Sequence, residues 1–405
     1  MKHWKKAIVS LLILALLALP LLGLLGCGKK ETGTVTIKVG YLTDLTGVAS
    51  PAMGPNQWAI LDCWEYMEKT DPIPGAKLKL VSYDTAFDPG RFIPGYEWLK
   101  SQGVVVMYSY MPQVTDTIVQ FLARDKMTVF SHTLDAVSAA SPWVFDSGMM
   151  VEDQYNLPLQ WLSDHWTNYP TKPKIGFVGW DTSYEVPIFD SMKAYVKSHP
   201  DKYDLVGSYA QPSGTVTWSG VVRALKDCDY VCPVFAGGTG YSSFISQFRA
   251  AGGTATFFGG EGTPCWTNLI IPTSGWEAMD GSFNAVTWPW YTGPSHTLIG
   301  VAKDALARRG KTELSLGYGY LSQVIAQAFW YELLKAAVEE VGAENVDSQS
   351  IYNTATKFHY TIEGMPEMSY SETNRVNTHS GMIYEWSAEA SDLVPISDWL
   401  LAPER

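Results

Sequence analysis

The residues that could carry out chemistry in this chain are few and lie far apart. The sequence contains no G-x-S-x-G elbow, P-loop, H-E-x-x-H pair or dinucleotide-binding glycine motif. Glu261 stands among glycines in Gly259-Gly260-Glu261-Gly262, which suits close backbone approach and a charge-assisted hydrogen bond. A solvated turn acid is the plain alternative for it. Asp181 has no reason in the sequence to meet Glu261 at catalytic distance, and we expect a binding protein rather than an enzyme.

The cysteines give no sign of a metal site. Cys228 and Cys232 flank Asp-Tyr-Val beside a predicted strand, and an extended chain of that length keeps their Cα atoms too far apart for a disulfide. No C-x-x-C pair and no histidine pair at ligand spacing occurs. We therefore expect no metal and no cofactor. We also expect Cys63, Cys228, Cys232 and Cys265 to be buried thiols, with disulfides as the alternative in an exported protein.

The first residues have the pattern of an export signal. A cationic head at Met1–Lys6 precedes the apolar stretch Ala7–Gly26. Leu24-Leu25-Gly26-Cys27 resembles the bacterial lipobox, which implies cleavage after residue 26 and lipidation of Cys27. Residues 27–34 would then be a polar tether, and the protein would lie outside the cytoplasm, lipid-anchored to the bacterial cell envelope. An uncleaved membrane anchor is the alternative, because about 18 apolar residues can span a bilayer.

Composition excludes several other classes of protein. Of 405 residues, 46% are hydrophobic and 17% are charged, which is typical of a globular chain. The net charge of -12 argues against nucleic-acid binding, since a basic surface is needed to displace counterions from phosphate. The 16 tryptophans and 22 tyrosines supply many flat apolar surfaces.

Strands and helices alternate along the first part of the chain. Period-two and buried apolar runs predict strands, and apolar residues at helical spacing predict the helices between them. The expected strands are Val35–Tyr41, Lys77–Tyr83, Val104–Tyr108 and Thr128–Ser131. The expected helices are Gln57–Lys69, Pro89–Gln102 and Val114–Leu122. Such alternation implies a parallel sheet with helices on both faces.

The same alternation then starts again. The expected strands are Lys174–Gly179, Asp204–Tyr209, Tyr230–Phe235, Thr256–Phe258 and Gly381–Trp386. The expected helices are Glu152–Trp166, Pro187–Ser198, Trp218–Leu225, Gly240–Ala251, Ser295–Arg309 and Gly319–Val341. The fold class we expect is α/β, with two doubly wound parallel-sheet lobes. Ligands bind at the carboxyl ends of such strands, so two lobes would hold a small molecule in the cleft between them.

Five short motifs carry a resemblance to a known family. They are Val39–Gly47, Tyr83–Pro89, Gly103–Ser109, Thr128–Thr133 and Phe258–Gly262. In this order they resemble the type I periplasmic binding proteins of ABC transporters, most closely the branched-chain amino acid (Leu/Ile/Val) and amide-binding group. The resemblance covers about residues 35–386.

The resemblance implies a periplasmic binding protein-like I fold, with lobes joined by a three-stranded hinge. Lobe one is expected to comprise residues 35–148 and 284–362. Lobe two is expected to comprise residues 149–283 and 363–405. Hinge closure around a ligand is the associated motion.

The resemblance also implies ligand-binding residues in lobe two. Glu261 falls where an acid pairs with the ligand ammonium in amino-acid-binding members. Tyr184 matches a tyrosine that stacks on the ligand, but Glu185 follows it where the family usually has glycine. The adjacent Trp180 and the later Trp288 add aromatic surface, which suggests a flatter or larger ligand. Core packing is the alternative for each tryptophan.

Lobe one matches the family less faithfully. Hydroxyl and amide groups after two strands bind the ligand carboxylate in family members, and Ser109, Ser131 and Thr133 take those places here. Their neighbours Tyr110 and His132 are larger than usual and are expected to line the site too. Asp135, where a threonine is common, would oppose a carboxylate. An α-amino acid is therefore not the only ligand class expected, and a cation would suit the acids and aromatic rings.

The function implied by the resemblance is ligand capture for an ABC importer. The protein would bind an amino acid, amide or aromatic compound and deliver it to the permease, with the ATPase as a separate subunit. A ligand sensor that signals to a membrane receptor is the first alternative, since it would close around ligand in the same way. An enzyme is the second.

Overall fold

Two parallel sheets with the same strand order form the frame of the protein. The computed structural model describes residues 33–132, 139–294 and 296–403. The first sheet has the order β2-β1-β3-β4-β5 and the second contains the run β10-β9-β8-β6-β7. The first comprises β1 (Val35–Thr43), β2 (Ala76–Asp84), β3 (Val106–Ser109), β4 (Val129–Ser131) and β5 (Val144–Asp146). The second comprises β6 (Lys174–Trp180), β7 (Asp204–Gln211), β8 (Tyr230–Val234), β9 (Thr256–Gly259) and β10 (Phe283–Val286).

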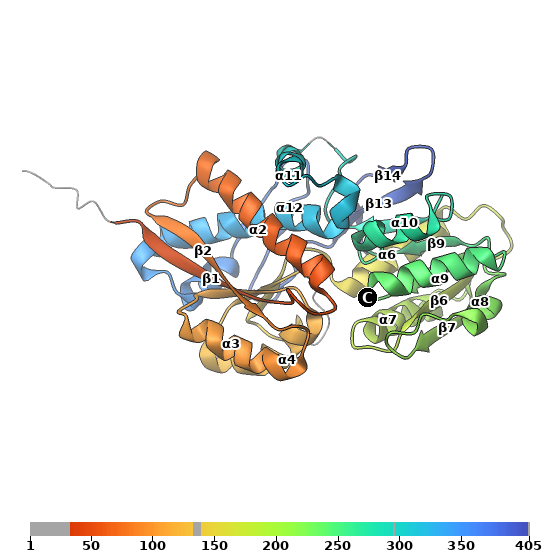
Figure 1. Ribbon diagram of the computed structural model, residues 1–405, viewed down its shortest axis with the longest axis horizontal. Helices are drawn as coiled ribbons and strands as arrows, with labels where there is room; N and C mark the ends of the chain where they lie inside the picture. Colours follow the sequence, from red (N-terminus) through yellow and green to blue (C-terminus); the bar gives the residue numbers. More distant parts are fainter. Residues whose placement is uncertain (1–32, 133–138, 295, 404–405) are drawn as a thin grey trace, which may run out of the picture. The chain divides into compact units, whose positions relative to one another are not determined.

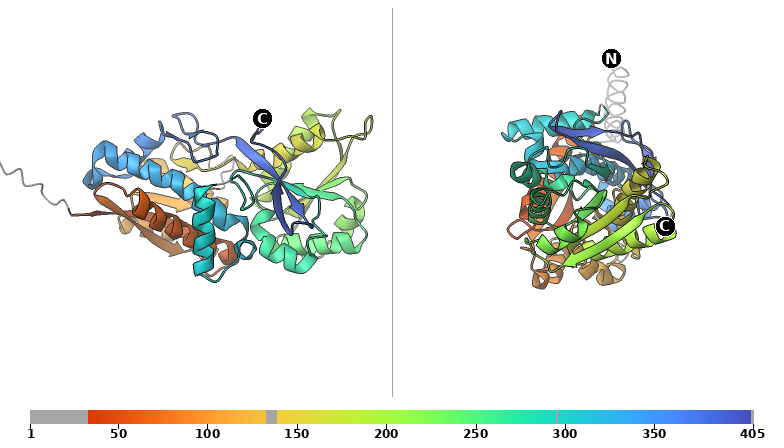
Figure 2. Two further views of the ribbon diagram at one scale, coloured as in Figure 1. Left: turned by 90° about the horizontal axis from the view of Figure 1, so that it is seen from above. Right: turned by 90° about the vertical axis from the view of Figure 1, so that its right-hand side faces the viewer.

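The C-terminal strands extend the second sheet. β13 (Ser380–Ser387) pairs antiparallel with β10, and β14 (Asp392–Pro395) pairs with β13 at the sheet edge. The short β15 (Leu400–Leu401) pairs with the start of β13. Figure 2 shows these blue strands beside the green ones of the second sheet. A separate ribbon is formed by β11 (His359–Tyr360) and β12 (Met368–Ser369).

Helices cover both faces of the first sheet, and together they form lobe one. α3 and α4 lie on one face, whereas α2 and α12 lie on the other (Figure 1). α11 packs on α2 and α12, and α13 packs on α12. The elements are α2 (Ser50–Thr70), η1 (Pro89–Arg91), α3 (Phe92–Ser101), α4 (Pro112–Asp125), α11 (Thr297–Arg308), α12 (Glu313–Val341), η3 (Ala343–Asn345) and α13 (Ser348–Ala355).

Lobe two is built in the same way on the second sheet. Its helices are α6 (Val151–Asp164), α7 (Glu185–Ser198), α8 (Ser219–Leu225), α9 (Gly238–Ala250), η2 (Pro264–Trp266) and α10 (Thr267–Ser274). Alternation along β6 explains the two layers, because successive side chains point to opposite faces. Ile175 and Phe177 join the core under α6 and α7, whereas Val178 joins the core under α8 to α10.

The chain passes between the lobes three times. The first passage follows β5 at residues 147–150, and the second follows β10 at Thr287. The third lies just before β13, because Val376 still bridges to Asp146 of β5 and the Asp146 amide donates to the Arg375 carbonyl at 2.7 Å. The expected lobe limits at residues 284 and 363 remain a prediction. From this strand pairing we propose 287 and about 377 instead.

The predicted α/β fold with two parallel-sheet lobes is confirmed, and the differences lie in element ends and in elements that were not expected. α12 begins at Glu313 instead of Gly319, and Gly317 (φ 66°, ψ -168°) breaks the helix between them. A β-carbon at Gly317 would lie 2.4 Å from the Cys265 carbonyl oxygen, so close approach to lobe two requires glycine there. α7 begins two residues before Pro187, and the elements that were not anticipated include β5, β10, α10 and α13.

The N-terminal predictions lie outside the described residues. These are the signal segment 1–26, the lipidated Cys27 and most of the tether. Within the described ranges, no helix is both long and apolar enough to cross a membrane.

Candidate functional site

Glu261 is the charged group at the centre of the site. It follows β9, and only 6% of its surface is exposed. The Thr287 amide, just after β10, donates to Glu261 Oε1 at 2.5 Å. The Tyr318 hydroxyl of α12 lies 3.4 Å from the same oxygen, but it also lies 3.1 Å from the Trp288 carbonyl. Its single proton is shared between two acceptors, which leaves the carboxylate with few donors.

His132 of lobe one faces this carboxylate. It follows β4, and its Nε2 lies 4.0 Å from Glu261 Oε2. Its Nδ1 lies 3.2 Å from the Ser147 hydroxyl, in the first passage between lobes. Strand ends of both sheets therefore meet at one point, as expected for a site in the cleft of two α/β lobes.

Burial shifts the pKa values of both Glu261 and His132 toward the neutral forms. It raises the pKa of Glu261 from 4.5 to about 7, and the bonds from Thr287 and Tyr318 oppose that shift only in part. Burial lowers the pKa of His132 from 6.5 to about 4. Near pH 7 the histidine is neutral, and Glu261 can gain or lose a proton with little change in free energy.

Aromatic rings surround His132. Its ring stacks against Trp288, with centroids 6.3 Å apart and planes at 19°. Tyr110 approaches it edge-on at 6.2 Å. Tyr110 also stacks on Trp330 of α12, and its hydroxyl accepts a 2.6 Å hydrogen bond from Gln327 Nε2. The lobe-one side of the site is therefore a packed aromatic wall.

Two of the predicted lobe-one hydroxyls are buried. Ser109 and Ser131 end β3 and β4, and both are fully buried. The Ser109 hydroxyl is 2.8 Å from the hydroxyl of Thr115 in α4. Thr133 and Asp135 lie outside the described residues, so their roles stay predictions.

Tyr184 lies on the lobe-two side, near the loop that carries Glu261. A β-carbon at Gly262 would lie 2.9 Å from the Tyr184 hydroxyl, 2.9 Å from that of Tyr155 and 3.0 Å from that of Tyr241. Three tyrosine hydroxyls thus gather against one glycine, and any side chain there would displace them. Tyr155 and Tyr241 were not predicted, because they come from α6 and α9, far away in sequence.

Trp180 and Glu185 support this side from within lobe two. Trp180 packs on Phe235 with centroids 5.4 Å apart, and its indole N–H donates to the Thr215 carbonyl at 2.9 Å. Glu185 is fully buried, and its carboxylate accepts from the Thr182 hydroxyl and, at 2.7 Å, from the Ala236 amide. The departure from glycine at residue 185 therefore ties the β6–α7 loop to the end of β8.

Two aspartates shape the loop after β1. Asp44 accepts from the amides of Thr46, Gly47 and Ala49 at 3.2, 2.5 and 2.8 Å. Asp84 accepts from the Leu45 amide at 2.9 Å. Asp84 also accepts from the Ala86 amide of its own loop at 2.9 Å, so the acids of the first two family-like motifs satisfy backbone amides of both loops.

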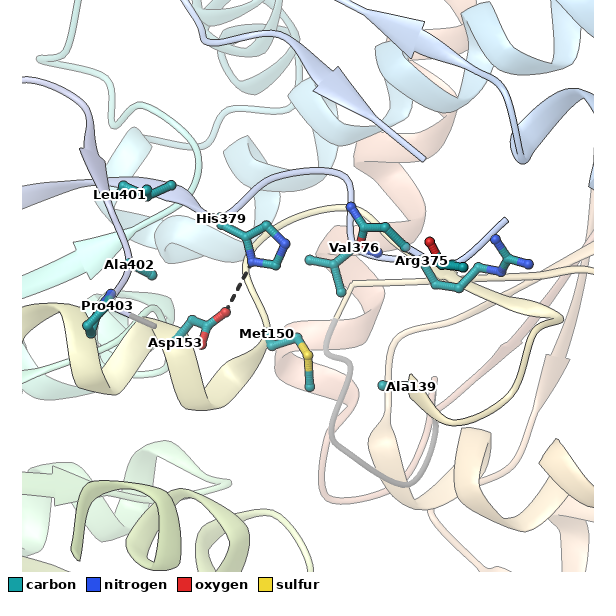
Figure 3. A pocket seen from close by; sticks show the side chains of 11 residues that line it. Ala139, Met150, Asp153, Arg375, Val376, His379, Leu401, Ala402 and Pro403 are labelled. Carbon is teal, nitrogen blue, oxygen red and sulfur yellow. Dashed lines mark hydrogen bonds and ion pairs between the residues drawn. The ribbon is translucent and has the colours of Figure 1, made fainter. Parts of the chain in front are cut away.

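A separate pocket of about 490 Å³ lies beside the passages between the lobes (Figure 3). Met150 and Asp153 line it from the first passage and α6, and Val376 and His379 line it from the third. His379 Nδ1 is 3.4 Å from Asp153 Oδ2, as the dashed line shows.

The described residues bring together Glu261, His132, Tyr110 and Tyr184, all predicted from the sequence. Three partners were missed as contacts of Glu261 or His132: Thr287, Trp288 and Tyr318. Thr287 and Trp288 follow β10, so the tendency of ligand sites to lie at the carboxyl ends of strands could have drawn attention to them. Tyr318 belongs to α12, and no such signal pointed to it. No cluster suited to a metal ion occurs among the described residues. Cys63, Cys228 and Cys232 are buried and unpaired, and the unpaired Cys265 is half-buried.

Comparisons with known proteins identify the family to which this fold belongs. A family model described as periplasmic binding protein matches residues 36–391. No curated protein sequence matches the chain. The fold resembles a branched chain amino acid ABC transporter protein from Thermus thermophilus with bound valine, at 14% identity and a TM-score of 0.78, over 91% of this chain and 97% of that one.

Two further solved structures show the range of relatives. One is a solute binding protein of an ABC transporter from Rhodopseudomonas palustris HaA2 in complex with p-hydroxybenzoic acid, at 14% identity and a TM-score of 0.74, over 91% and 98% of the two chains. The other is a fatty acid ABC transporter substrate-binding protein from Thermomonospora curvata, at 16% identity and a TM-score of 0.76, over 91% and 92%. The family match spans most of the sequence, and this chain belongs to the periplasmic binding protein family, whose members bind solutes and are not catalysts.

Proposed function

We propose that the protein is the substrate-binding subunit of an ABC importer. It captures a small ligand between its lobes and presents the closed form to the permease, while a separate ATPase subunit drives transport. The observation that carries the proposal is the approach of Glu261 and His132 from opposite lobes, 4.0 Å apart and buried. A polar ligand held there would contact both lobes at once and favour the closed state.

We propose that the ligand site comprises most of the predicted residues. Glu261, Tyr184, His132 and Tyr110 contact the ligand, with Ser109, Ser131 and Thr133 at its lobe-one side. Trp180 acts from the core of lobe two, since its ring packs on Phe235 there. Similar proteins carry names or ligands that include valine, p-hydroxybenzoic acid and fatty acids, so the fold alone does not set the ligand.

We propose further that Cys27 carries a lipid which holds the protein at the outer face of a bacterial membrane. The lipobox-like sequence before Cys27 and the cationic, apolar segment ahead of it support this. Metabolic labelling with a fatty acid, compared between the wild type and Cys27→Ala, tests it. Equal label in both would contradict the anchor.

A thermal-shift screen of amino acids, amides, amines, aromatic acids and fatty acids tests the binding function. A ligand raises the unfolding temperature by mass action. Glu261→Ala and Tyr184→Ala are expected to weaken binding of any compound found, and unchanged affinity in both would refute the site. Adjacent genes for a permease and an ATPase would favour transport over sensing.

A further inference from the structure

The segments that follow the parallel strands carry acidic side chains but no lysine or arginine. Between each parallel strand and the next element along the chain, no segment contains lysine or arginine. The same segments contain Asp44, Asp181 and Glu261. A ligand carboxylate bound there would meet no cationic side chain from these segments, although such pairs are the strongest hydrogen-bonded partners for it.

Backbone amides could replace a cation, because loops and helix starts at strand ends often bind anions. Here the protein's own carboxylates occupy several of them. Asp44 accepts hydrogen bonds from three amides of the loop after β1, and Glu185 accepts one from the Ala236 amide in the β8–α9 loop. Glu261 itself takes the Thr287 amide. The positions most suited to an anionic ligand already hold an internal anion.

The start of α4 is also poorly suited to an anion. Pro112 stands at its first position and has no N–H to donate. The amides of Val114 and Thr115 both donate to the Met111 carbonyl, at 3.0 and 3.1 Å. The nearby Ser109 hydroxyl is engaged with that of Thr115.

The groups around Glu261 suit a cation instead. His132 is neutral near pH 7 and so does not compete as a counter-ion. Among the described residues, the other titratable groups coupled to the carboxylate are Tyr318 and the Cys265 thiol, and burial holds both neutral by raising their pKa values. A ligand ammonium would therefore be the missing positive partner of a buried carboxylate.

Trp288 adds a second requirement. Its side chain is fully buried, and its indole N–H has no hydrogen-bond partner among the described residues. A buried donor without a partner is unfavourable, so a ligand that offers a neutral oxygen would gain from it. Its ring lies against His132 and can also attract a cation through its π face.

We infer that the ligand is a small organic cation without a carboxylate, which places its ammonium or amidinium group on Glu261 and a neutral oxygen toward Trp288. This inference rests on the proposed function and specifies the ligand of the same site. It separates this protein from a zwitterion binder, because a ligand carboxylate would meet no lysine or arginine after the strands, and several described amides there already bind internal carboxylates or the start of α4.

Two matched sets of compounds test the ligand class by calorimetry at pH 8. The first set is valinamide, valinol and valine, and the second is para-hydroxybenzylamine and para-hydroxybenzoate. In each set the compounds share a body and differ in the carboxylate. At least one amine or amide is expected to bind at least about tenfold more tightly than its carboxylate-bearing counterpart, since like charges oppose the latter.

Glu261→Gln and pH provide the control. The variant keeps an acceptor for the Thr287 amide and removes the charge, so it should weaken binding of the amine about thirtyfold or more. Ionised Glu261 binds the cation, and the affinity of the wild type for valinol or para-hydroxybenzylamine, whose amines stay protonated, should therefore rise about tenfold from pH 6 to pH 8. The variant should show no such rise. Trp288→Phe should weaken valinamide binding by about fivefold, through the lost donor.

The outcomes separate this inference from the proposed function. Tighter binding of valine or para-hydroxybenzoate than of the amines, with no effect of Glu261→Gln, overturns the cationic ligand and leaves a solute-binding function intact. Absence of binding by every amine also overturns it. Native mass spectrometry of protein isolated from cells tests the solute-binding function separately. A co-purified small molecule of any charge supports that function. A co-purified carboxylate contradicts the inference of a cationic ligand.

Discussion

The two lobes contribute different groups where β4 and β9 end and the candidate site lies. In lobe one, Tyr108, Tyr110 and Phe130 stack around Trp330, with ring centroids 5.1 to 5.9 Å from it. In lobe two, the strand ends carry buried carboxylates, Glu185 and Glu261, which accept backbone amides. The same fold thus supplies packed aromatic rings on the lobe-one side and buried carboxylates on the lobe-two side.

The two sides should therefore respond differently to changes in side-chain volume and in pH. Packing is insensitive to pH but sensitive to volume, because protein cores are densely filled. A buried carboxylate tolerates small changes of volume but depends on its donors and on pH. Each prediction below changes one group and measures stability, pH dependence or affinity.

The largest effect is expected from Trp330→Ala. The side chain is fully buried and stacks on three rings, so its removal leaves a large cavity. We expect a loss of about 4 kcal/mol in the free energy of unfolding, measured in urea. The half-exposed Trp98 is the matched control, and Trp98→Ala should change stability by less than about 1 kcal/mol. Equal losses would mean that the aromatic wall does not stabilise lobe one.

The second effect concerns pH. Glu261 keeps a proton in the folded state up to about pH 7, whereas its ordinary pKa is 4.5. The folded state therefore holds more protons than the unfolded state in this window, and stability falls as pH rises. Relative to Glu261→Gln, the wild type should lose about 3 kcal/mol between pH 4.5 and pH 7.

His132 should give the opposite slope. Its pKa falls from 6.5 to about 4, so the unfolded state holds more protons between those values and stability rises with pH. Relative to His132→Asn, the wild type should gain about 3 kcal/mol from pH 4 to pH 6.5. The two contributions nearly cancel in the wild type, so only the single variants expose them. Parallel slopes in both variants would contradict the charge assignments.

A smaller effect is expected for Glu185→Ala. It removes the acceptor for the Ala236 amide and the Thr182 hydroxyl, and leaves that amide unsatisfied. We expect a loss of about 2 kcal/mol by urea unfolding. Glu185→Gln keeps an acceptor and should lose less than half of this. If the glutamine variant were the less stable of the two, the carboxylate charge rather than the hydrogen bond would be what holds the loop.

The smallest effect is expected for Trp180→Phe. The change keeps the ring on Phe235 but loses the bond to the Thr215 carbonyl, at a cost of about 1 kcal/mol in stability. Affinity for a bound ligand should stay within about twofold. A tenfold weaker affinity would return Trp180 to the ligand-contacting residues.

The sequence predicted the fold because the repeated alternation of strands and helices is a local pattern. Glu261 was also predictable, since the glycines around it mark a strand end. Its partners were not, because Thr287 and Tyr318 lie 26 and 57 residues away and reach it only through β10 and α12.

Glu185 shows the same limit more sharply. Its departure from the family pattern is visible in the sequence, but its partner Ala236 lies 51 residues away at the end of another strand. Helix periodicity also missed the first turn of α12, because Gly317 interrupts the helix just before Gly319, where the predicted helix began. Contacts between distant strand ends depend on sheet register, which no local pattern states.

The dependence of lobe one on late residues bears on how quickly the protein can fold. The Thr128 amide, next to β4, donates to the Ser348 hydroxyl at 2.6 Å, and β5 is completed by Arg375 and Val376. These pairs are separated by more than 200 positions in sequence, and folding slows as contacts become less local. The first sheet therefore cannot reach its final form until the chain beyond residue 376 is available. We expect β4 and β5 to gain hydrogen-exchange protection late in refolding, after β6 and β8.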